Sequence, residues 1–300
     1  MQYDQLTTEA VNANTTHLDE MTAAEIVAAM DASDREAAQA VHRAQPALTR
    51  AVQAAYEAID AGGRVIYLGA GTSGRLGVLD ASECPPTFGV EPELFVGVIA
   101  GGDTALRRSV ENAEDNPAGG EAALRELNLT DRDFVVAISA SGSAPYCLGA
   151  LEYARAVGAK TGAVVCNVAS PMAQLAEIPM ELITGPEVLS GSTRLKAGTA
   201  TKMALNMIST GAMALWGKTY ENLMVDVRAT NRKLIDRCVR IVMRATGADR
   251  PQAEKLIQEA GGNLKAAILM RLTGATLPQI LSALEKAKGH VKRAEAILKA

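Results

Sequence analysis

Short apolar runs recur through the middle of the chain, and alanine-rich stretches with helical spacing lie between most of them. Five such runs cover residues 64–69, 94–102, 133–139, 162–168 and 180–185. Apolar strands that alternate with helices are typical of a parallel sheet with helices on both faces. We therefore predict an α/β fold with right-handed crossovers, in which a ligand binds beyond the carboxyl ends of the strands.

The segment before the first run has a helical pattern. Residues 22–60 are rich in Ala and contain no Gly, which predicts two helices. We expect the second helix to begin near Ser33, a residue type that caps helices, ahead of Asp34 and Glu36. We also expect Pro46 to kink or divide it, because proline lacks the backbone N–H that a helix interior needs.

The last fifty residues follow a different sequence pattern, in which short helical stretches are separated by Gly-Gly, Thr-Gly and Lys-Gly. A glycine stop followed by an apolar helix occurs at both 260–269 and 287–298. We predict a small C-terminal helical bundle, and we divide the chain into a main domain, residues 1–247, and a helical subdomain, residues 248–300.

Composition narrows the class of protein. The 300 residues are 48% hydrophobic and 21% charged, which suits a globular protein with a substantial core. Aromatic residues make up 3% and the net charge is −4, so a nucleic-acid partner is not expected. The amino terminus lacks the basic and apolar regions of a signal peptide, and no apolar run is long enough to span a membrane. We expect a cytoplasmic protein with no membrane partner.

The cysteines and histidines do not predict a metal site. The four cysteines show no C-x-x-C pair and no zinc spacing, which favours reduced, buried thiols. They are Cys84, Cys147, Cys166 and Cys238. We therefore expect no metal and no cofactor.

Residues 69–74, GAGTSG, match the G-x-G-x-x-G spacing of loops that hold a dinucleotide pyrophosphate. Thr72 and Ser73 lie in this loop, and their hydroxyls also suit a compact phosphate monoester. A dinucleotide site needs an acidic residue after the next strand. Asp103 is the candidate, but it lies about thirty residues beyond the loop instead of the usual ~20. The loop alone leaves both ligands open.

A second polar loop follows the third predicted strand. Ser139, Ser141 and Ser143 alternate with small residues, and Pro145 can open the following helix. Hydroxyls and backbone N–H groups at the amino end of a helix form a site for a small anion. Taken alone, a Ser-Gly loop is more often an ordinary turn. Two such loops after strands of one sheet favour a phosphate, and we predict that these three serines, with Thr72 and Ser73, surround it.

These two loops, GAGTSGR and SASGSAP, resemble those of the sugar isomerase (SIS) family of phosphosugar-binding domains. The motifs around them resemble one branch of that family, the N-acetylmuramic acid 6-phosphate etherases, over nearly the whole chain. They are LDASECPPTFG (79–89), AGGDTALRRSVENAEDN (100–116), GPEVLSGSTRLKAGTATKMALNMIST (185–210) and TTEAVNANTTHLDEMT (7–22).

The chain departs from the family pattern at two places. Val11 stands where the family has an arginine, and Ser143-Ala144 stands where it has Arg-Thr. The second change removes a cation beside the phosphate loop. Hydroxyls and N–H groups must then suffice, unless a nearby cation helps; the candidates are Arg75, Lys196 and Lys202.

The resemblance implies an SIS-type α/β domain and a lyase that removes D-lactate from C3 of a hexosamine 6-phosphate. Carried over from the family, Glu83 is the proton donor and Glu114 is the second acid/base residue. From local sequence alone, Glu83 would be an exposed residue near a helix end and Glu114 part of a solvated acidic run. Which glutamate removes the C2 proton stays open.

The remaining predictions concern the fifth strand, the assembly and the competing functions. Glu187 follows that strand, and we predict that it binds a sugar hydroxyl or assists ring opening. A homodimer is expected. The alternatives are a non-catalytic phosphosugar-sensing regulator on the same fold, which has no reason to keep both glutamates, and a dinucleotide-dependent oxidoreductase.

Overall fold

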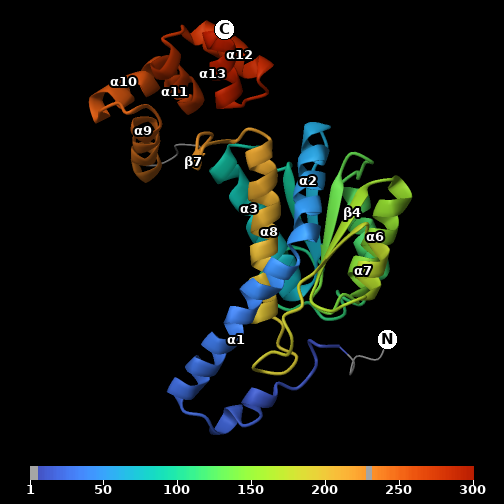
Figure 1. The fold of residues 1–300 in the computed structure, drawn as a ribbon. Helices are drawn as coiled ribbons and strands as arrows, with labels where there is room; N and C mark the ends of the chain where they lie inside the picture. Colours follow the sequence, from blue (N-terminus) through green and yellow to red (C-terminus); the bar gives the residue numbers. More distant parts are fainter. Residues whose placement is uncertain (1–5, 228–231) are drawn as a thin grey trace. The chain divides into compact units, whose positions relative to one another are not determined.

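The computed structural model describes residues 6–227 and 232–300 (Figure 1). The chain divides into two compact units. Unit 1 comprises Met1–Ser82 and Pro92–Ser209, and unit 2 comprises Glu83–Glu91 and Thr210–Ala300.

Unit 1 is built on a five-stranded parallel sheet, as the apolar runs predicted. Its strands are β1 (Val65–Gly69), β2 (Phe95–Ile99), β3 (Phe134–Ile138), β4 (Lys160–Val165) and β5 (Ile178–Glu181). They are ordered β2-β1-β3-β4-β5, and every pair is parallel. All residues of β1 and β3 are buried. These two strands therefore form the centre of the core, which explains why their sequences are apolar throughout.

Helices cover both faces of this sheet, with α2 and α8 on one face and α6 and α7 on the other (Figure 1). The helices are α1 (Ala23–Arg43), α2 (Gln45–Asp60), α3 (Gly71–Phe88), α4 (Asp103–Arg107), α5 (Pro117–Glu126), α6 (Pro145–Val157), α7 (Pro171–Leu175) and α8 (Lys196–Leu215). Two 3₁₀ turns, η2 (Ala13–Thr15) and η3 (Leu18–Glu20), precede them. The predicted α/β fold class is confirmed.

The prediction that a second helix begins near Ser33 is wrong. α1 begins one residue after Thr22, whose side chain forms a capping box with Glu25, and it continues through Ser33. The helices divide at Ala44 instead, and Pro46 occupies the first turn of α2. Proline is tolerated there because the N–H groups of a first turn have no partner within the helix.

Unit 2 combines a short hairpin with a helical bundle. The hairpin is β6 (Thr219–Tyr220) with β7 (Leu223–Met224), and the helices are α9 (Arg232–Thr246), α10 (Arg250–Glu259), α11 (Leu264–Thr273), α12 (Leu277–Lys286) and α13 (Val291–Lys299). Val242 of α9 shares one hydrophobic core with Ile268 and Ile280, and all three are fully buried. Unit 2 therefore includes α9 and the hairpin as well as the helices after residue 248. The sequence pattern also predicts a helix over residues 229–245, which overlaps α9, and residues 229–231 of that range lie outside the described part of the chain.

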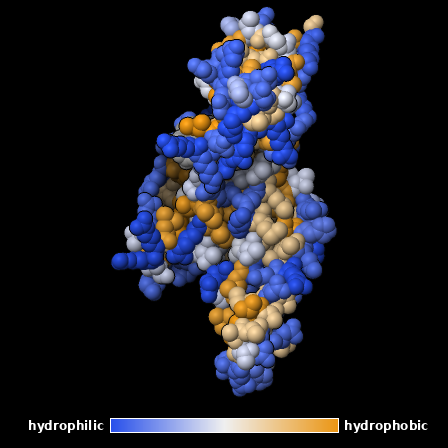
Figure 2. Space-filling view, turned by 90° about the vertical axis from the view of Figure 1, so that its left-hand side faces the viewer, coloured by the Kyte–Doolittle hydropathy of each residue, from blue (hydrophilic) through white to orange (hydrophobic). Residues whose placement is uncertain are grey.

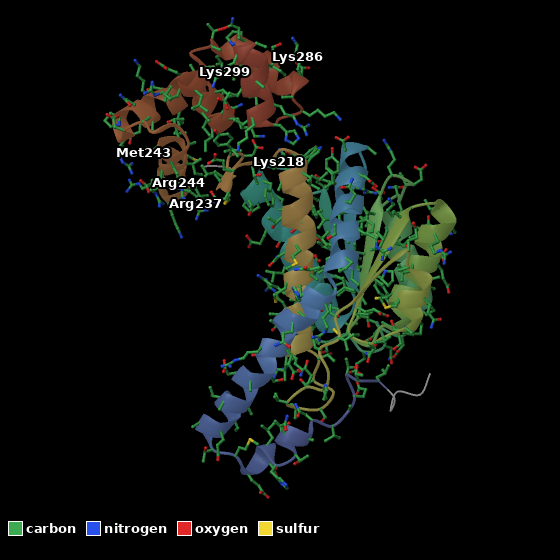
Figure 3. All side chains as sticks on the ribbon, viewed as in Figure 1. Lys218, Arg237, Met243, Arg244, Lys286 and Lys299 are labelled. Atoms are coloured by element: carbon green, nitrogen blue, oxygen red, sulfur yellow. The ribbon has the colours of Figure 1, made fainter. Side chains whose placement is uncertain are left out.

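The two parts of the chain carry opposite charge. Residues 210–300 contain 16 Lys and Arg against 8 Asp and Glu, whereas residues 1–209 contain 14 against 26. The basic side chains of unit 2 come from several elements, including Arg237 and Arg244 of α9 and Lys286 of α12 (Figure 3). The net charge of −4, on which we argued against a nucleic-acid partner, is therefore the sum of +8 in residues 210–300 and −12 in residues 1–209.

Within the described residues, no single helix is long and apolar enough to cross a membrane. In the part of the chain that the structure describes, one pair of helices, α11 and α12, reaches that length and composition when taken together, and the pair is bent by 110° at the break between them.

Candidate functional site

The two loops singled out in the sequence lie side by side at one edge of the sheet. β1 and β3 are parallel neighbours, and Gly69 at the end of β1 is in register with Ile138 at the end of β3. The strand order also reverses here, because the chain proceeds to β2 on one side of β1 and to β3 on the other. Open α/β sheets bind their ligands at such a switch point.

The first loop is tight because its glycines allow close backbone contacts. A Cβ atom added at Gly74 would lie 2.5 Å from the carbonyl oxygen of Gly69 and 2.6 Å from Ile99 Cγ1. Gly71 has a φ of +53°, in the left-handed region that favours glycine. α3 begins at Gly71, so Thr72 and Ser73 lie in its first turn. Their hydroxyls therefore lie beside the backbone N–H groups of a helix amino end.

In the second loop, Ser141 joins the other two serines. The hydroxyls of Ser139 and Ser141 are 3.1 Å apart, and the Ser143 hydroxyl donates to the Ser141 hydroxyl at 3.0 Å. The backbone N–H of Ser143 also donates to Ser141 Oγ, at 3.3 Å. Gly142 makes the turn with a φ of +71°, and any Cβ there would lie 2.2 Å from Ser170 Oγ. The loop is therefore ordered by its own hydroxyl groups.

A cavity of about 310 Å³ lies between the loops. Among its lining residues are five of the predicted site residues, namely Thr72, Ser73, Glu114, Ser139 and Ser141. Ser143 is not part of the lining and acts on it through Ser141. The cavity is also lined by Thr193, whose hydroxyl the sequence offered as a further phosphate contact, and by Glu9 and Thr201, which we did not single out from the sequence.

None of the described residues that line this cavity is a lysine or an arginine. The Arg75 guanidinium donates to the carbonyl oxygens of Ala105, at 2.7 Å, and Leu106, at 3.1 Å. The ammonium of Lys196, whose side chain is 2% exposed, forms an ion pair with Glu36 at 2.6 Å. An anion in the cavity would therefore be held by hydroxyls, N–H groups and the helix dipole.

Glu114 lies between α4 and α5 and contacts the start of α6. Its carbonyl oxygen accepts a hydrogen bond of 2.9 Å from the backbone N–H of Tyr146, just after the serine loop. Although the residue is exposed overall, protein atoms around its carboxyl displace water, which raises its pKa above the ordinary value. The nearby charge of Asp115 raises the pKa further. Glu114 therefore has the environment of a general acid or base.

The other two predicted glutamates do not line the cavity. Glu187 is 1% exposed, and its carboxylate accepts backbone hydrogen bonds from Lys196, at 3.2 Å, and Ala197, at 3.0 Å, so that it caps α8. Burial raises the pKa of Glu187, and those hydrogen bonds oppose the rise. Glu83 belongs to unit 2 and has an exposed side chain on α3. Roles for both in substrate turnover or binding stay predictions.

Family comparisons match most of unit 1. Residues 47–155 match the glucokinase regulatory protein N-terminal SIS domain, and residues 113–210 match the SIS domain. The phosphoheptose isomerase of Neisseria gonorrhoeae has the same fold, with a TM-score of 0.51 at 17% identity over 64% of this chain and all of that one.

Curated relatives match over nearly the whole chain. A protein of Serratia proteamaculans (strain 568), called N-acetylmuramic acid 6-phosphate etherase, is 55% identical over 88% of this chain and 89% of its own. A protein of Halalkalibacterium halodurans with the same name is 53% identical over the same shares of the two chains. A third, from Jannaschia sp. (strain CCS1), is 52% identical over 88% of this chain and 83% of its own.

Proposed function

The chain belongs to the N-acetylmuramic acid 6-phosphate etherase family and is a carbon–oxygen lyase, and we propose that it works by elimination followed by addition of water, with Glu83 and Glu114 as the acid/base pair. It cleaves the D-lactyl ether of N-acetylmuramic acid 6-phosphate and yields N-acetylglucosamine 6-phosphate and D-lactate.

The open-chain form of the sugar makes this route feasible. An alkoxide is a poor leaving group, but the C1 aldehyde acidifies the proton on C2. A base removes that proton while an acid protonates the ether oxygen, the bond between C3 and that oxygen breaks, and lactate leaves. Water then adds to C3 of the unsaturated aldehyde, and C2 regains a proton. Two acid/base groups are the minimum for this sequence.

One observation carries the assignment of the cavity: two hydroxyl-rich loops meet at the switch point of the sheet, with α3 beginning in one and α6 directly after the other. Their hydroxyl and N–H groups suit the 6-phosphate, and the absence of cations from the described lining matches a site that relies on such donors. The volume of about 310 Å³ lies at the lower end of the range for small-molecule sites.

The two glutamates rest on different support. Glu114 lines the cavity and has a raised pKa, as an acid/base residue near neutral pH requires. We propose that it serves C2 or the incoming water. The assignment of Glu83 depends on the motif ASECPPTF, which this chain shares with the family. We propose that Glu83 protonates the leaving lactate oxygen.

Lactate release tests the function directly. Purified protein given N-acetylmuramic acid 6-phosphate should release D-lactate, measured with a coupled dehydrogenase. A phosphosugar-sensing regulator, the alternative suggested by the match to the glucokinase regulatory protein domain, would bind the sugar phosphate and release none.

Isotope tracing tests the proposed route. In heavy-oxygen, deuterated water, elimination should place the heavy oxygen at sugar C3 and deuterium at C2, and the lactate hydroxyl should stay unlabelled. Hydrolysis at the lactyl carbon would label the lactate instead. Displacement at C3 would label the sugar oxygen and leave C2 without deuterium. Either of these patterns would refute the roles of Glu83 and Glu114.

We also propose that the protein acts in the cytoplasm as a homodimer. Apolar side chains lie on the surface of unit 1 over the first half of α1 (Figure 2). Val27 there is 66% exposed, and Ile26 and Met30 are half-buried beside it. Sedimentation should detect a dimer, and Val27→Glu, which places a charge on this surface, should weaken it; a wild-type monomer would refute the proposal.

A further inference from the structure

The amino-terminal residues 6–9 form a strap across the serine loop. Leu6 and Thr8 are buried, at 6% and 1% exposure, although they lie near the chain end. Three hydrogen bonds fix the strap to Asn167, beyond the end of β4, and in one of them the backbone N–H of Thr8 donates to Asn167 Oδ1 at 3.4 Å. The Thr7 hydroxyl donates to Asn167 Oδ1 at 2.8 Å, and Asn167 Nδ2 donates to the Thr8 hydroxyl at 3.0 Å. The strap is therefore held by a side chain about 160 residues away.

The same amide group also holds the serine loop. Asn167 Nδ2 donates to the carbonyl oxygens of Ala140, at 3.0 Å, and Ser141, at 3.4 Å. Asn167 is 3% exposed, so water does not compete for these bonds. An amide can donate and accept at once, which an aspartate or a leucine of the same size cannot do. Asn167 thus links the strap to the loop that we assign to the phosphate.

The strap brings Glu9 into the wall of the cavity. Glu9 lines it together with Glu114, so these are the two carboxylates among its described residues. A Cβ atom added at Gly191 would lie 3.1 Å from Glu9 Oε2, and Gly191 has a φ of +76°. The carboxylate of Glu9 therefore lies against the turn before α8, near Thr193, which also lines the cavity.

We propose that Glu9 is a substrate-binding residue that accepts a hydrogen bond from the sugar, and that Asn167 is the residue that positions it. The inference rests on the proposed function, because it takes the cavity as the sugar-phosphate site. An ionised carboxylate only accepts hydrogen bonds, and it repels a phosphate. Its partner is therefore a hydroxyl or the amide N–H of the acetamido group, and Glu9 marks the sugar end of the cavity.

The test is a double-mutant cycle with steady-state kinetics on N-acetylmuramic acid 6-phosphate. Glu9→Gln should lower kcat/KM about ten- to hundredfold, the scale of a lost hydrogen bond to a charged group. Inorganic phosphate, used as a competitive inhibitor, should bind this variant no more weakly than wild type. Glu20→Gln, which changes an acid with a 76% exposed side chain in the same amino-terminal segment, should behave as wild type.

Asn167→Ala should lower kcat/KM to a similar degree in the wild-type background and by much less in the Glu9→Gln background, because residues that act through one another are not additive. Thr7→Val, which removes only a contact of the strap, should show the same dependence on Glu9 and serves if Asn167→Ala does not fold. A folded Glu9→Gln variant with normal kcat/KM would overturn the inference, as would independent, multiplying effects of the two substitutions. Wild-type protein that releases no lactate would overturn the proposed function itself.

Discussion

The backbone N–H of Tyr146 donates a hydrogen bond of 2.9 Å to the carbonyl oxygen of Glu114. Tyr146 lies in the first turn of α6, which begins at Pro145 directly after the serine loop. One helix end therefore fixes both the candidate acid/base residue and the candidate phosphate loop. This contact gives Glu114 a defined place at the cavity although it lies in an irregular segment.

The first prediction separates the chemistry of Glu114 from the fold. Glu114→Gln keeps the shape of the side chain and the backbone contact to Tyr146, so the protein should fold and bind the sugar phosphate. Turnover should fall by about 10²- to 10⁴-fold, the contribution of a positioned acid or base. The control is Glu111→Gln, which changes an exposed acid in the same segment. Near-normal kcat in a folded Glu114→Gln variant would remove its catalytic assignment.

The second prediction concerns pH. Burial and then the charge of Asp115 raise the pKa of Glu114. If ionised Glu114 is the base in the free enzyme, kcat/KM should fall as the pH drops through that raised pKa. Asp115→Asn removes one of the two causes, so the acidic limb of the kcat/KM profile should move to lower pH. A limb that stays in place, or moves upward, would contradict this role.

The third prediction concerns the phosphate. Ser141→Ala removes the hydroxyl that joins Ser139 and Ser143, and it removes a donor from the cavity. A lost hydrogen bond to a charged group costs about 1.5–3 kcal/mol, so kcat/KM for the 6-phosphate should fall about ten- to hundredfold. We expect the unphosphorylated sugar to be a poor substrate because it lacks the phosphate that the two loops bind, and Ser141→Ala should change its kcat/KM little. Ser282→Ala in unit 2 is the control. Equal losses with both sugars would show that Ser141 does not bind the phosphate.

The fourth prediction concerns the first loop. Gly74→Ala would place a methyl group 2.5 Å from the Gly69 carbonyl oxygen, and backbone would have to move. Overpacking of this kind costs about 1–3 kcal/mol, so thermal denaturation should show a lower Tm. At Gly198 the added atom would lie 3.5 Å from the nearest atom, in ordinary contact. Gly198→Ala should therefore leave Tm unchanged or raise it, and an equal loss in the two variants would refute the steric argument.

The fifth prediction concerns stability away from the site. Asp133 is 1% exposed and accepts hydrogen bonds from Arg64 and from the Thr130 backbone N–H. Burial alone would raise the pKa of Asp133, but these bonds and the charge of Arg64 lower it below its usual value. Asp133→Asn should lower the free energy of unfolding by about 3 kcal/mol, measured by chemical denaturation at pH 7. This value is at the lower end of the range for breaking a buried ion pair, because Arg64 is partly exposed.

The pH dependence of that stability has a definite sign. Because the folded-state pKa of Asp133 is lowered, its contribution is complete above the unfolded pKa of about 3.9 and is lost as the pH falls through the folded value. Wild-type stability should therefore fall below about pH 4 more steeply than that of Asp133→Asn. Asp131→Asn, a change in an exposed residue two positions away, should match wild type at every pH.

The sequence by itself determined most of the local elements and the residue types of the proposed phosphate site. The apolar runs marked β1 and β3 over their whole length because a strand buried on both faces must be apolar. The half-buried β5 was marked less well, since the run predicted at 180–185 overlaps it only at Met180 and Glu181. The glycines and hydroxyls after β1 and β3 could be recognised because loop conformation and helix starts depend on neighbouring residues. The long motifs determined the family. Through the family resemblance, the same motifs point to Glu83 and Glu114 as an acid/base pair. The raised pKa of Glu114 is compatible with such a role.

Only the tertiary structure decided which distant residues share the cavity. No local pattern shows that β3 pairs with β1 or that Glu114 lies against α6, because strand order and loop paths depend on how whole elements pack. Glu9 and Asn167 escaped notice for the same reason: each is an ordinary polar residue in sequence, and Thr7 reaches Asn167 only across 160 positions. Ser33 shows the opposite error, since a residue suited to capping remained inside a helix whose start was already satisfied by Thr22 and Glu25. Neighbouring residues are enough to set the conformation and chemistry of each loop, whereas the cavity forms only when the folded sheet brings the loops together.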